Sequence, residues 1–166
     1  MKHIPKQQWM GCAVAATAML ADVSYEEVAA HWPDLDEARM REPGQLCGLL
    51  EAVTDVPWGF SACWNLQPAV SQFSFPSWPV AVFIQDNGVN PRFGQWIVVR
   101  NEIVHDPGAW TSHVVARYPG RDWLVTYVAQ PLRPEQFARS LARRRLQQIR
   151  NIFQSVKTDA HHGARR

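Results

Sequence analysis

The spacing of hydrophobic positions divides the chain into successive parts, of which the first is helical. Residues 12–20 form a run of small and apolar helix formers that opens directly after Gly11. Ser24, followed three residues later by Glu27, has the capping-box spacing that starts a second helix. A third helix is predicted from apolar residues at helical spacing, namely Leu46, Leu49, Leu50 and Val53. Residues 1–55 are therefore expected to form a helical part.

Residues 56–78 have a different pattern, in which prolines alternate with aromatic side chains. The prolines prevent a long helix, and the aromatic residues are too numerous for a solvated linker. We predict a packed, irregular connector that contains a strand or a short helix.

From residue 79 onward the hydrophobic pattern is that of β-strands. Residues 80–84 are almost entirely apolar, as in a strand at the centre of a sheet. Segments 112–118 and 123–129, joined by a turn rich in proline and glycine, are predicted to pair as a hairpin. Helices first and an antiparallel sheet over 79–130 indicate the α+β class.

A further hairpin is predicted on either side of a two-residue loop at 101–102. With that loop, Val98 lies opposite His105, and successive side chains point to alternate faces of the sheet. Gln95 and Asp106 then become diagonal neighbours on one face, while His105 points to the other face. The hairpin therefore places an amide and a carboxylate near each other on the same face of the sheet.

The C-terminal part, beyond a domain over residues 1–132, is predicted as a basic amphipathic helix over 133–157. Pro134 suits the first position of such a helix, and apolar residues recur on one of its faces. Residues 158–166 have no fold signal and are expected to form a flexible tail.

Composition narrows the class of protein. The three cysteines, Cys12, Cys47 and Cys63, are an odd number without metal-type spacing, so we expect no disulfide framework, no metal site and no cofactor. The N-terminus lacks the apolar region of a signal peptide, and no apolar run is long enough to cross a bilayer. We expect a cytoplasmic protein without membrane contact.

Charge is distributed unevenly along the chain. Residues 133–166 hold nine Lys or Arg and two acidic residues, whereas residues 1–132 have a net charge of −5. This asymmetry predicts an acidic partner for the basic helix, either the chain's own domain or another molecule. Nucleic acid is the alternative partner, and an ordinary solvated helix face is the simpler interpretation.

Cys12 is the first candidate for chemistry. It lies in the first turn of the predicted helix, where unpaired N–H groups and the helix dipole favour a thiolate over a thiol. A thiolate is the nucleophilic form of cysteine. The alternative is that Cys12 is a small buried hydrophobic residue, as many free cysteines are.

Three pieces of the sequence carry a resemblance to a known family. They are Gln7 or Gln8 before Gly11-Cys12, then the strand Gln95-Trp96-Ile97-Val98-Val99, and finally Asp106-Pro107. In this order they resemble the papain-like cysteine peptidases, specifically the bacterial peptidase C39-like group. The resemblance covers roughly residues 5–110, leaves out the C-terminal helix, and implies a papain-like fold with a peptide or protein substrate in its cleft.

The resemblance also implies roles for the matching residues. Cys12 would attack a carbonyl carbon, and Gln7 or Gln8 would help the backbone hold the oxyanion. Asp106 would orient the base. The spacing from either glutamine to Cys12 is shorter than is usual in the family, so the choice between the two stays open.

Gln95 is the departure from the family pattern, because the family has a histidine at this position. A glutamine amide takes no proton near neutral pH and so cannot serve as the base. Three explanations are open. The protein is a natural pseudoenzyme, Gln95 is an introduced substitution for histidine, or strand 95–99 does not correspond to the family's histidine strand. His105 faces away from Asp106, and His113 is the remaining candidate base.

Two main functions follow from these residues. The first is a C39-like cysteine peptidase that is impaired or inactive as written, because Gln95 replaces the base. The second is a non-catalytic papain-fold module that binds a peptide or protein in the cleft. Binding of nucleic acid or an acidic partner by the basic helix is a third function, which the other two do not exclude.

Overall fold

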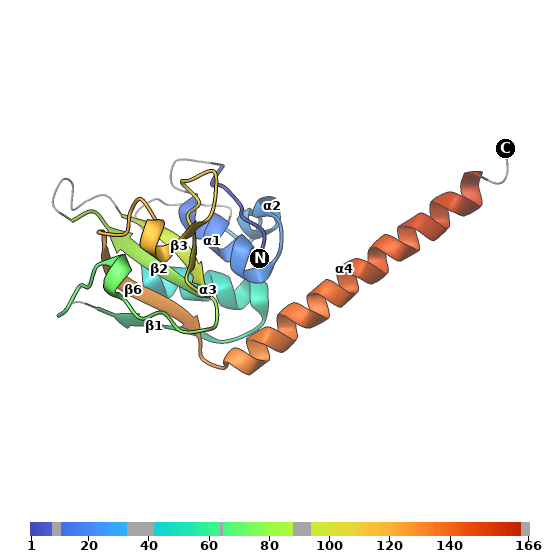
Figure 1. Ribbon diagram of the computed structural model, residues 1–166. Coiled ribbons are helices and arrows are strands. Elements are labelled where there is room, and N and C mark those ends of the chain that lie inside the picture. Colours follow the sequence, from blue (N-terminus) through green and yellow to red (C-terminus); the bar gives the residue numbers. More distant parts are fainter. Residues whose placement is uncertain (8–10, 33–41, 64, 88–93, 164–166) are drawn as a thin grey trace.

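A computed structural model describes residues 1–7, 11–32, 42–63, 65–87 and 94–163 of the chain, with side chains described as far as 154. The described residues form an α+β structure, as the sequence predicts: a sheet bears helices on one face, and one long helix projects from it (Figure 1). The helices are α1 (Cys12–Ala21), α2 (Tyr25–Ala29), α3 (Pro43–Thr54) and α4 (Pro134–Gly163).

The sheet has six antiparallel strands in the spatial order β1-β6-β2-β3-β4-β5. These strands are β1 (Trp58–Ala62), β2 (Val80–Gln85), β3 (Gly94–Arg100), β4 (Ile103–His105), β5 (His113–Val114) and β6 (Leu124–Pro131). β2 is buried along nearly its whole length and lies near the centre of the sheet, which confirms the prediction for residues 80–84.

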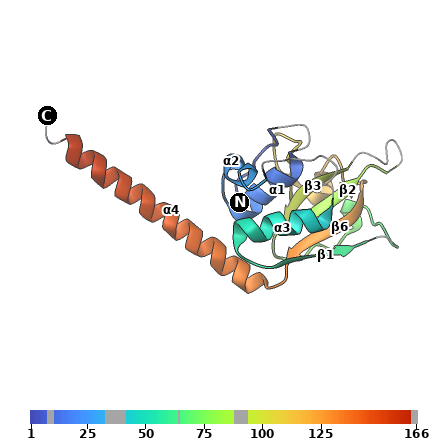
Figure 2. The same cartoon turned by 180° about the vertical axis from the view of Figure 1, so that it is seen from behind.

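The two faces of the sheet belong to two separate hydrophobic clusters. Trp96 and Val98 of β3 join the cluster that contains α1 and α3, whereas Ile97 and Val99 join a cluster on the opposite face. This alternation is the period of two expected of a strand that is buried on both sides. Viewed from behind, α1 and α3 lie across one face of the sheet (Figure 2).

α1 is buried at all ten of its positions. A helix without a polar face must be enclosed on every side, and its alanines allow the close approach to β3 that this requires. The capping box of α2 is also confirmed, because the backbone N–H of Glu27 donates to Ser24 Oγ at 3.1 Å. α3 begins at Pro43, the favoured N-terminal position for proline.

The hairpin between β3 and β4 has the predicted register. Val98 lies opposite His105 and Arg100 lies opposite Ile103. The loop residues Asn101 and Glu102 have φ angles of 50° and 59°. Positive φ at both central positions is the geometry of the tight two-residue turn that matches the twist of the strands.

The hairpin predicted for 112–118 and 123–129 is wrong. β5 is a two-residue strand on β4, and a 3-10 turn follows it (Val115–Arg117), whereas β6 lies between β1 and β2. β6 is buried on both faces along much of its length, so its place is inside the sheet. The connector 56–78 contains a strand and a short helix, as predicted, but its strand β1 is an edge of the same sheet.

The base of α4 is fastened to the C-terminal ends of α3 and α1. Phe137 is 1% exposed and packs edge-on against Trp58, with ring centroids 5.2 Å apart. Ser140 Oγ donates to the carbonyl oxygen of Thr54 at 2.9 Å, and the Arg144 guanidinium donates to that of Val53. These carbonyls are the unpaired acceptors at the end of α3, where positive charge is also favoured by the helix dipole.

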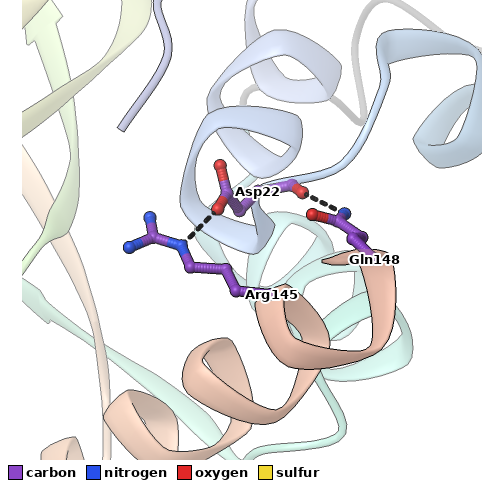
Figure 3. Close-up of polar contacts among 3 residues, drawn as sticks. All are labelled: Asp22, Arg145 and Gln148. Atoms are coloured by element: carbon purple, nitrogen blue, oxygen red, sulfur yellow. Dashed lines mark hydrogen bonds and ion pairs between the residues drawn. The ribbon is translucent and has the colours of Figure 1, made fainter. Parts of the chain in front are cut away.

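The end of α1 is held in the same way (Figure 3). Arg145 Nε donates to Asp22 Oδ2 at 2.6 Å, and Gln148 Nε2 donates to the Asp22 carbonyl oxygen at 3.3 Å. One arginine of the basic helix therefore pairs with an acidic residue of the domain. α4 continues to Gly163, which corrects the predicted end at 157. Six residues assigned to a flexible tail are helical, because residues 135–162 contain no proline or glycine that would end the helix.

Candidate functional site

Cys12 is the first residue of α1, directly after the N-cap residue Gly11. Its side chain is only 8% exposed. Burial raises the pKa of the Cys12 thiol, while the backbone N–H of Trp96 and the positive charge of Lys6 lower it to a smaller extent. The expectation of a thiolate at the helix N-terminus is therefore wrong in its net direction: desolvation dominates, and the group is a thiol at neutral pH.

Gln95 and Asp106 meet as the hairpin predicts. Gln95 Nε2 donates to Asp106 Oδ2 at 2.9 Å. The same carboxylate oxygen accepts from the Tyr118 hydroxyl at 2.8 Å, and Oδ1 accepts from the backbone N–H of Gly108 at 2.7 Å. Asp106 is 7% exposed, and these three donors satisfy it.

The turn after Asp106 is shaped to bring these groups together. A Cβ atom added at Gly108 would lie 3.1 Å from both Asp106 Oδ1 and Gln95 Oε1. That spacing is tighter than ordinary van der Waals contact. Gly108 therefore permits the close approach of the carboxylate and the amide at the end of β4.

The peptide group that follows Gln95 lies near Cys12. The N–H that lies against the Cys12 thiol belongs to the peptide bond between Gln95 and Trp96. Trp96 is fully buried within the cluster that joins β3 to α1. The structure thus brings the start of α1, the start of β3 and the end of β4 into one neighbourhood.

The structure describes only one of the two candidate oxyanion residues, Gln7. Gln7 is exposed, and its Nε2 donates to Glu26 Oε1 at 2.5 Å, so its amide is committed to α2. The hydrogen bond from Gln7 also lowers the pKa of Glu26. Gln8 lies outside the described residues, and its predicted role stays a prediction.

Neither His113 nor His105 is among the groups that donate a hydrogen bond to the Asp106 carboxylate in the described part of the chain. His113 pairs with Val104 in the sheet, and its ring centroid lies 6.1 Å from that of Tyr118. His105 is buried on the face opposite Asp106, where its Nδ1 lies 2.7 Å from Ser112 Oγ. The three groups that hydrogen-bond to the Asp106 carboxylate come from Gln95, Tyr118 and Gly108.

His105 makes the stability of the fold sensitive to mild acid. Burial, His3 and the N-terminal charge lower the pKa of His105 to about 4. Because the unfolded chain binds this proton near pH 6.5, the contribution of His105 to stability is complete above pH 6.5 and is lost as pH falls toward 4. We expect the free energy of unfolding to fall by about 1–2 kcal/mol between pH 7 and pH 5 on this account, allowing for screening.

Urea denaturation at the two pH values measures this loss. His105→Gln should reduce the difference in free energy between pH 7 and pH 5. His31→Gln, which changes an exposed histidine of the helical part, should retain the difference found in the unaltered protein. An equal pH dependence in the unaltered protein and in His105→Gln would show that His105 is not responsible.

Three further residues lie in this neighbourhood, and no sequence motif identifies them as site residues. The Tyr118 hydroxyl, in the turn after β5, donates to Asp106. The positive charge of Lys6 lowers the pKa of Cys12. The backbone N–H of Lys6 donates to the Pro107 carbonyl oxygen at 3.0 Å. Tyr25 of α2 is 4% exposed, and burial followed by the proximity of Cys12 raises its pKa. All three reach the site through tertiary contacts between distant segments.

Comparisons with known proteins do not assign the chain to a family. No protein-family model matches the sequence, and no curated protein matches it either.

Within the described ranges, no group of three or more His, Cys, Asp or Glu side chains is placed to hold a metal ion. No helix in that part of the chain is both long and apolar enough to span a bilayer.

Proposed function

We propose that the chain is a papain-like cysteine peptidase of the C39 type in which the site is incomplete, so that amide bonds are not hydrolysed at an appreciable rate. The observation that carries this proposal is the 2.9 Å hydrogen bond from Gln95 to Asp106, at the residue next to Trp96, whose backbone N–H lies near the Cys12 thiol. Position 95 thereby has a carboxylate neighbour, as the family resemblance implies for the catalytic histidine. The α+β order, with the cysteine helix before an antiparallel sheet, agrees with it.

The chemistry of position 95 limits what the site does. An amide nitrogen has no basic lone pair, so Gln95 neither deprotonates Cys12 nor forms a thiolate–imidazolium pair. Burial holds the Cys12 thiol in its protonated form. Nucleophilic attack on a carbonyl carbon therefore lacks its activating step.

Labelling of Cys12 with iodoacetamide tests this assignment. In the unaltered protein we expect Cys12 to react more slowly than a free cysteine at pH 7, because both its burial and its raised pKa disfavour the thiolate. Mass spectrometry of the peptide that contains Cys12 separates it from Cys47, which is buried, and from the more accessible Cys63. Fast labelling of Cys12 near pH 7 would contradict the proposal and point to another base.

Hydrolysis provides a second measurement on the same protein. A library of fluorogenic peptides should release no more product with the unaltered protein than with Cys12→Ala. Hydrolysis that disappears in Cys12→Ala would show that the site is active as written.

A non-catalytic binding function is favoured by one further observation. A groove of about 610 Å³ lies between the N-terminal segment and α2, with Ile4, Gln7 and Tyr25 among its lining residues. Tyr25 also interacts electrostatically with Cys12, so one residue of the groove is close to the candidate site. A peptide bound there in extended form would lie along the cleft without being cleaved, and its affinity should be equal for the unaltered protein and Cys12→Ser.

A further inference from the structure

Beyond its base, α4 leaves the domain and exposes an apolar stripe. Figures 1 and 2 show the helix projecting well past the sheet and the other helices. Its exposed apolar residues are Leu146, Ile149, Ile152 and Phe153, at 58%, 49%, 62% and 64% exposure. Four large apolar side chains on one projecting helix are more than scattered surface residues, and such patches mark interaction sites.

The stripe continues into a groove between α4 and the domain. The groove has a volume of about 500 Å³, and Trp78 and Pro79 form part of its wall on the domain side. On the helix side it is lined by Ala138, Ala142 and Leu146, among others. Leu146 therefore belongs both to the groove and to the exposed stripe, which makes them one continuous surface.

The shape of this surface fits a helix that lies along α4. Ala142, Leu146, Ile149 and Phe153 are spaced by four, three and four residues, the narrow seam of a helix pair. A second helix on this seam would also enter the groove beside Trp78. A flat bilayer surface could cover the projecting stripe, but it could not follow the seam into a groove walled by the domain.

The charges beside the seam determine the kind of helix. Arg139, Arg143 and Arg150 are exposed and recur at spacings that place them along one edge of the seam. Residues 136–154 contain no acidic side chain. Opposite charges along such edges decide which helices pair, and like charges exclude the wrong partners.

A second copy of α4 is a poor partner by this criterion. In an antiparallel pair the arginine edges of the two helices would face each other, and in a parallel pair Arg150 would approach Arg145 of the second copy. Nucleic acid would neutralise the arginines but would leave the apolar seam uncovered. Two arginines of the Arg143-Arg144-Arg145 run are, moreover, bound to the ends of α3 and α1.

We propose that the seam of α4 and the groove beside Trp78 form a docking surface for an acidic amphipathic helix of a partner protein. Its apolar face covers Leu146, Ile149 and Phe153, and its carboxylates pair with Arg143 and Arg150. The inference is independent of the proposed function, because the surface lies on another part of the molecule from Cys12 and uses none of the residues of that site.

Two designed peptides of 28 residues test the proposal on the full chain. Both have leucine at every a and d position of a heptad repeat; one has glutamate and the other lysine at every e and g position. We expect fluorescence anisotropy to show saturable binding of the acidic peptide, at least about tenfold tighter than that of the basic peptide. Raising the salt concentration should weaken this binding, because exposed charge pairs are screened.

A matched pair of variants locates the surface. Ile149→Asp places a carboxylate in the seam and should weaken binding of the acidic peptide at least tenfold. Asn151→Asp adds the same charge at an exposed position two residues away, on another face of the helix, and should change the affinity less than twofold. Both positions are exposed, so the fold should survive either change, which circular dichroism verifies.

Four outcomes would overturn the proposal. The first is absence of saturable binding, and the second is equal loss of affinity in Ile149→Asp and Asn151→Asp. The third is a dimer in light scattering that Ile149→Asp dissociates, which would assign the surface to a second copy. The fourth is binding to vesicles with 30% phosphatidylglycerol, or to duplex DNA, that Ile149→Asp or Arg150→Glu abolishes while the acidic peptide does not bind.

Discussion

Gln95→His should convert Cys12 from a protonated buried thiol into a reactive thiolate. A histidine at this position would have Asp106 as its hydrogen-bond acceptor in place of the Gln95 amide. Its second ring nitrogen would be available to Cys12 and would hold the proton of the thiol as an imidazolium. We expect the pH midpoint for labelling of Cys12 to fall from above that of a free cysteine to below 7.

The pH profile is a better measure of this change than a single rate. Lowering the pKa of a thiol raises its thiolate fraction but also lowers the nucleophilicity of that thiolate, so the two effects partly cancel. At pH 6 the larger thiolate fraction should still prevail and raise the labelling rate about tenfold. Iodoacetamide labelling from pH 5 to pH 10, followed on the Cys12 peptide, gives both quantities.

Two controls separate a base from a local perturbation. Gln95→Asn keeps an amide at position 95 and should leave the midpoint of the profile where it is in the unaltered protein. Asp106→Asn, added to Gln95→His, removes the orienting carboxylate and should move the midpoint part of the way back. Identical profiles for Gln95→His and Gln95→Asn would show that position 95 is not beside the thiol in a catalytic geometry.

The sequence predicts the parts of the fold that local rules determine. The loop at Asn101 and Glu102 fixes the register of its hairpin, and the period of two then decides which side chains share a face. That reasoning predicts that Gln95 and Asp106 are diagonal neighbours on one face, and the structure confirms it with a hydrogen bond between them. The capping box at Ser24 is equally local.

The pairing of β6 is not local. Segment 124–131 pairs with β1 and β2, which lie many residues earlier, instead of with the strand that immediately precedes it. No turn signal encodes such a pairing, since it depends on which strand can be buried on both faces. The positions of Tyr118 and Lys6 near the site are not predicted for the same reason, because their contacts join segments that are not adjacent in sequence.

The protonation state of Cys12 depends on two opposing influences, and the sequence indicates only one of them. A position after glycine at the start of a helix indicates the N–H groups that favour a thiolate. The burial that raises its pKa results from packing against β3, which no sequence pattern around Cys12 indicates. The prediction therefore has the right location and the wrong net direction.

Phe137→Ala should cause the largest loss of stability among the substitutions considered. Phe137 is 1% exposed and packs edge-on against Trp58, the first residue of β1. Removing a fully buried phenylalanine ring should lower the free energy of unfolding by about 3–5 kcal/mol, because the ring loses its burial and leaves a cavity. Urea denaturation followed by tryptophan fluorescence measures this loss.

Phe153→Ala is the matched control, since the same side chain is removed from the same helix at a position that is 64% exposed. This change should alter the free energy of unfolding by no more than about 0.5 kcal/mol. The pair distinguishes the base of α4, which belongs to the domain through Phe137, Ser140 and Arg144, from its projecting half, which does not. Equal losses in the two variants would mean that the projecting half is also packed in solution, and the exposed seam would then already have a partner within the chain.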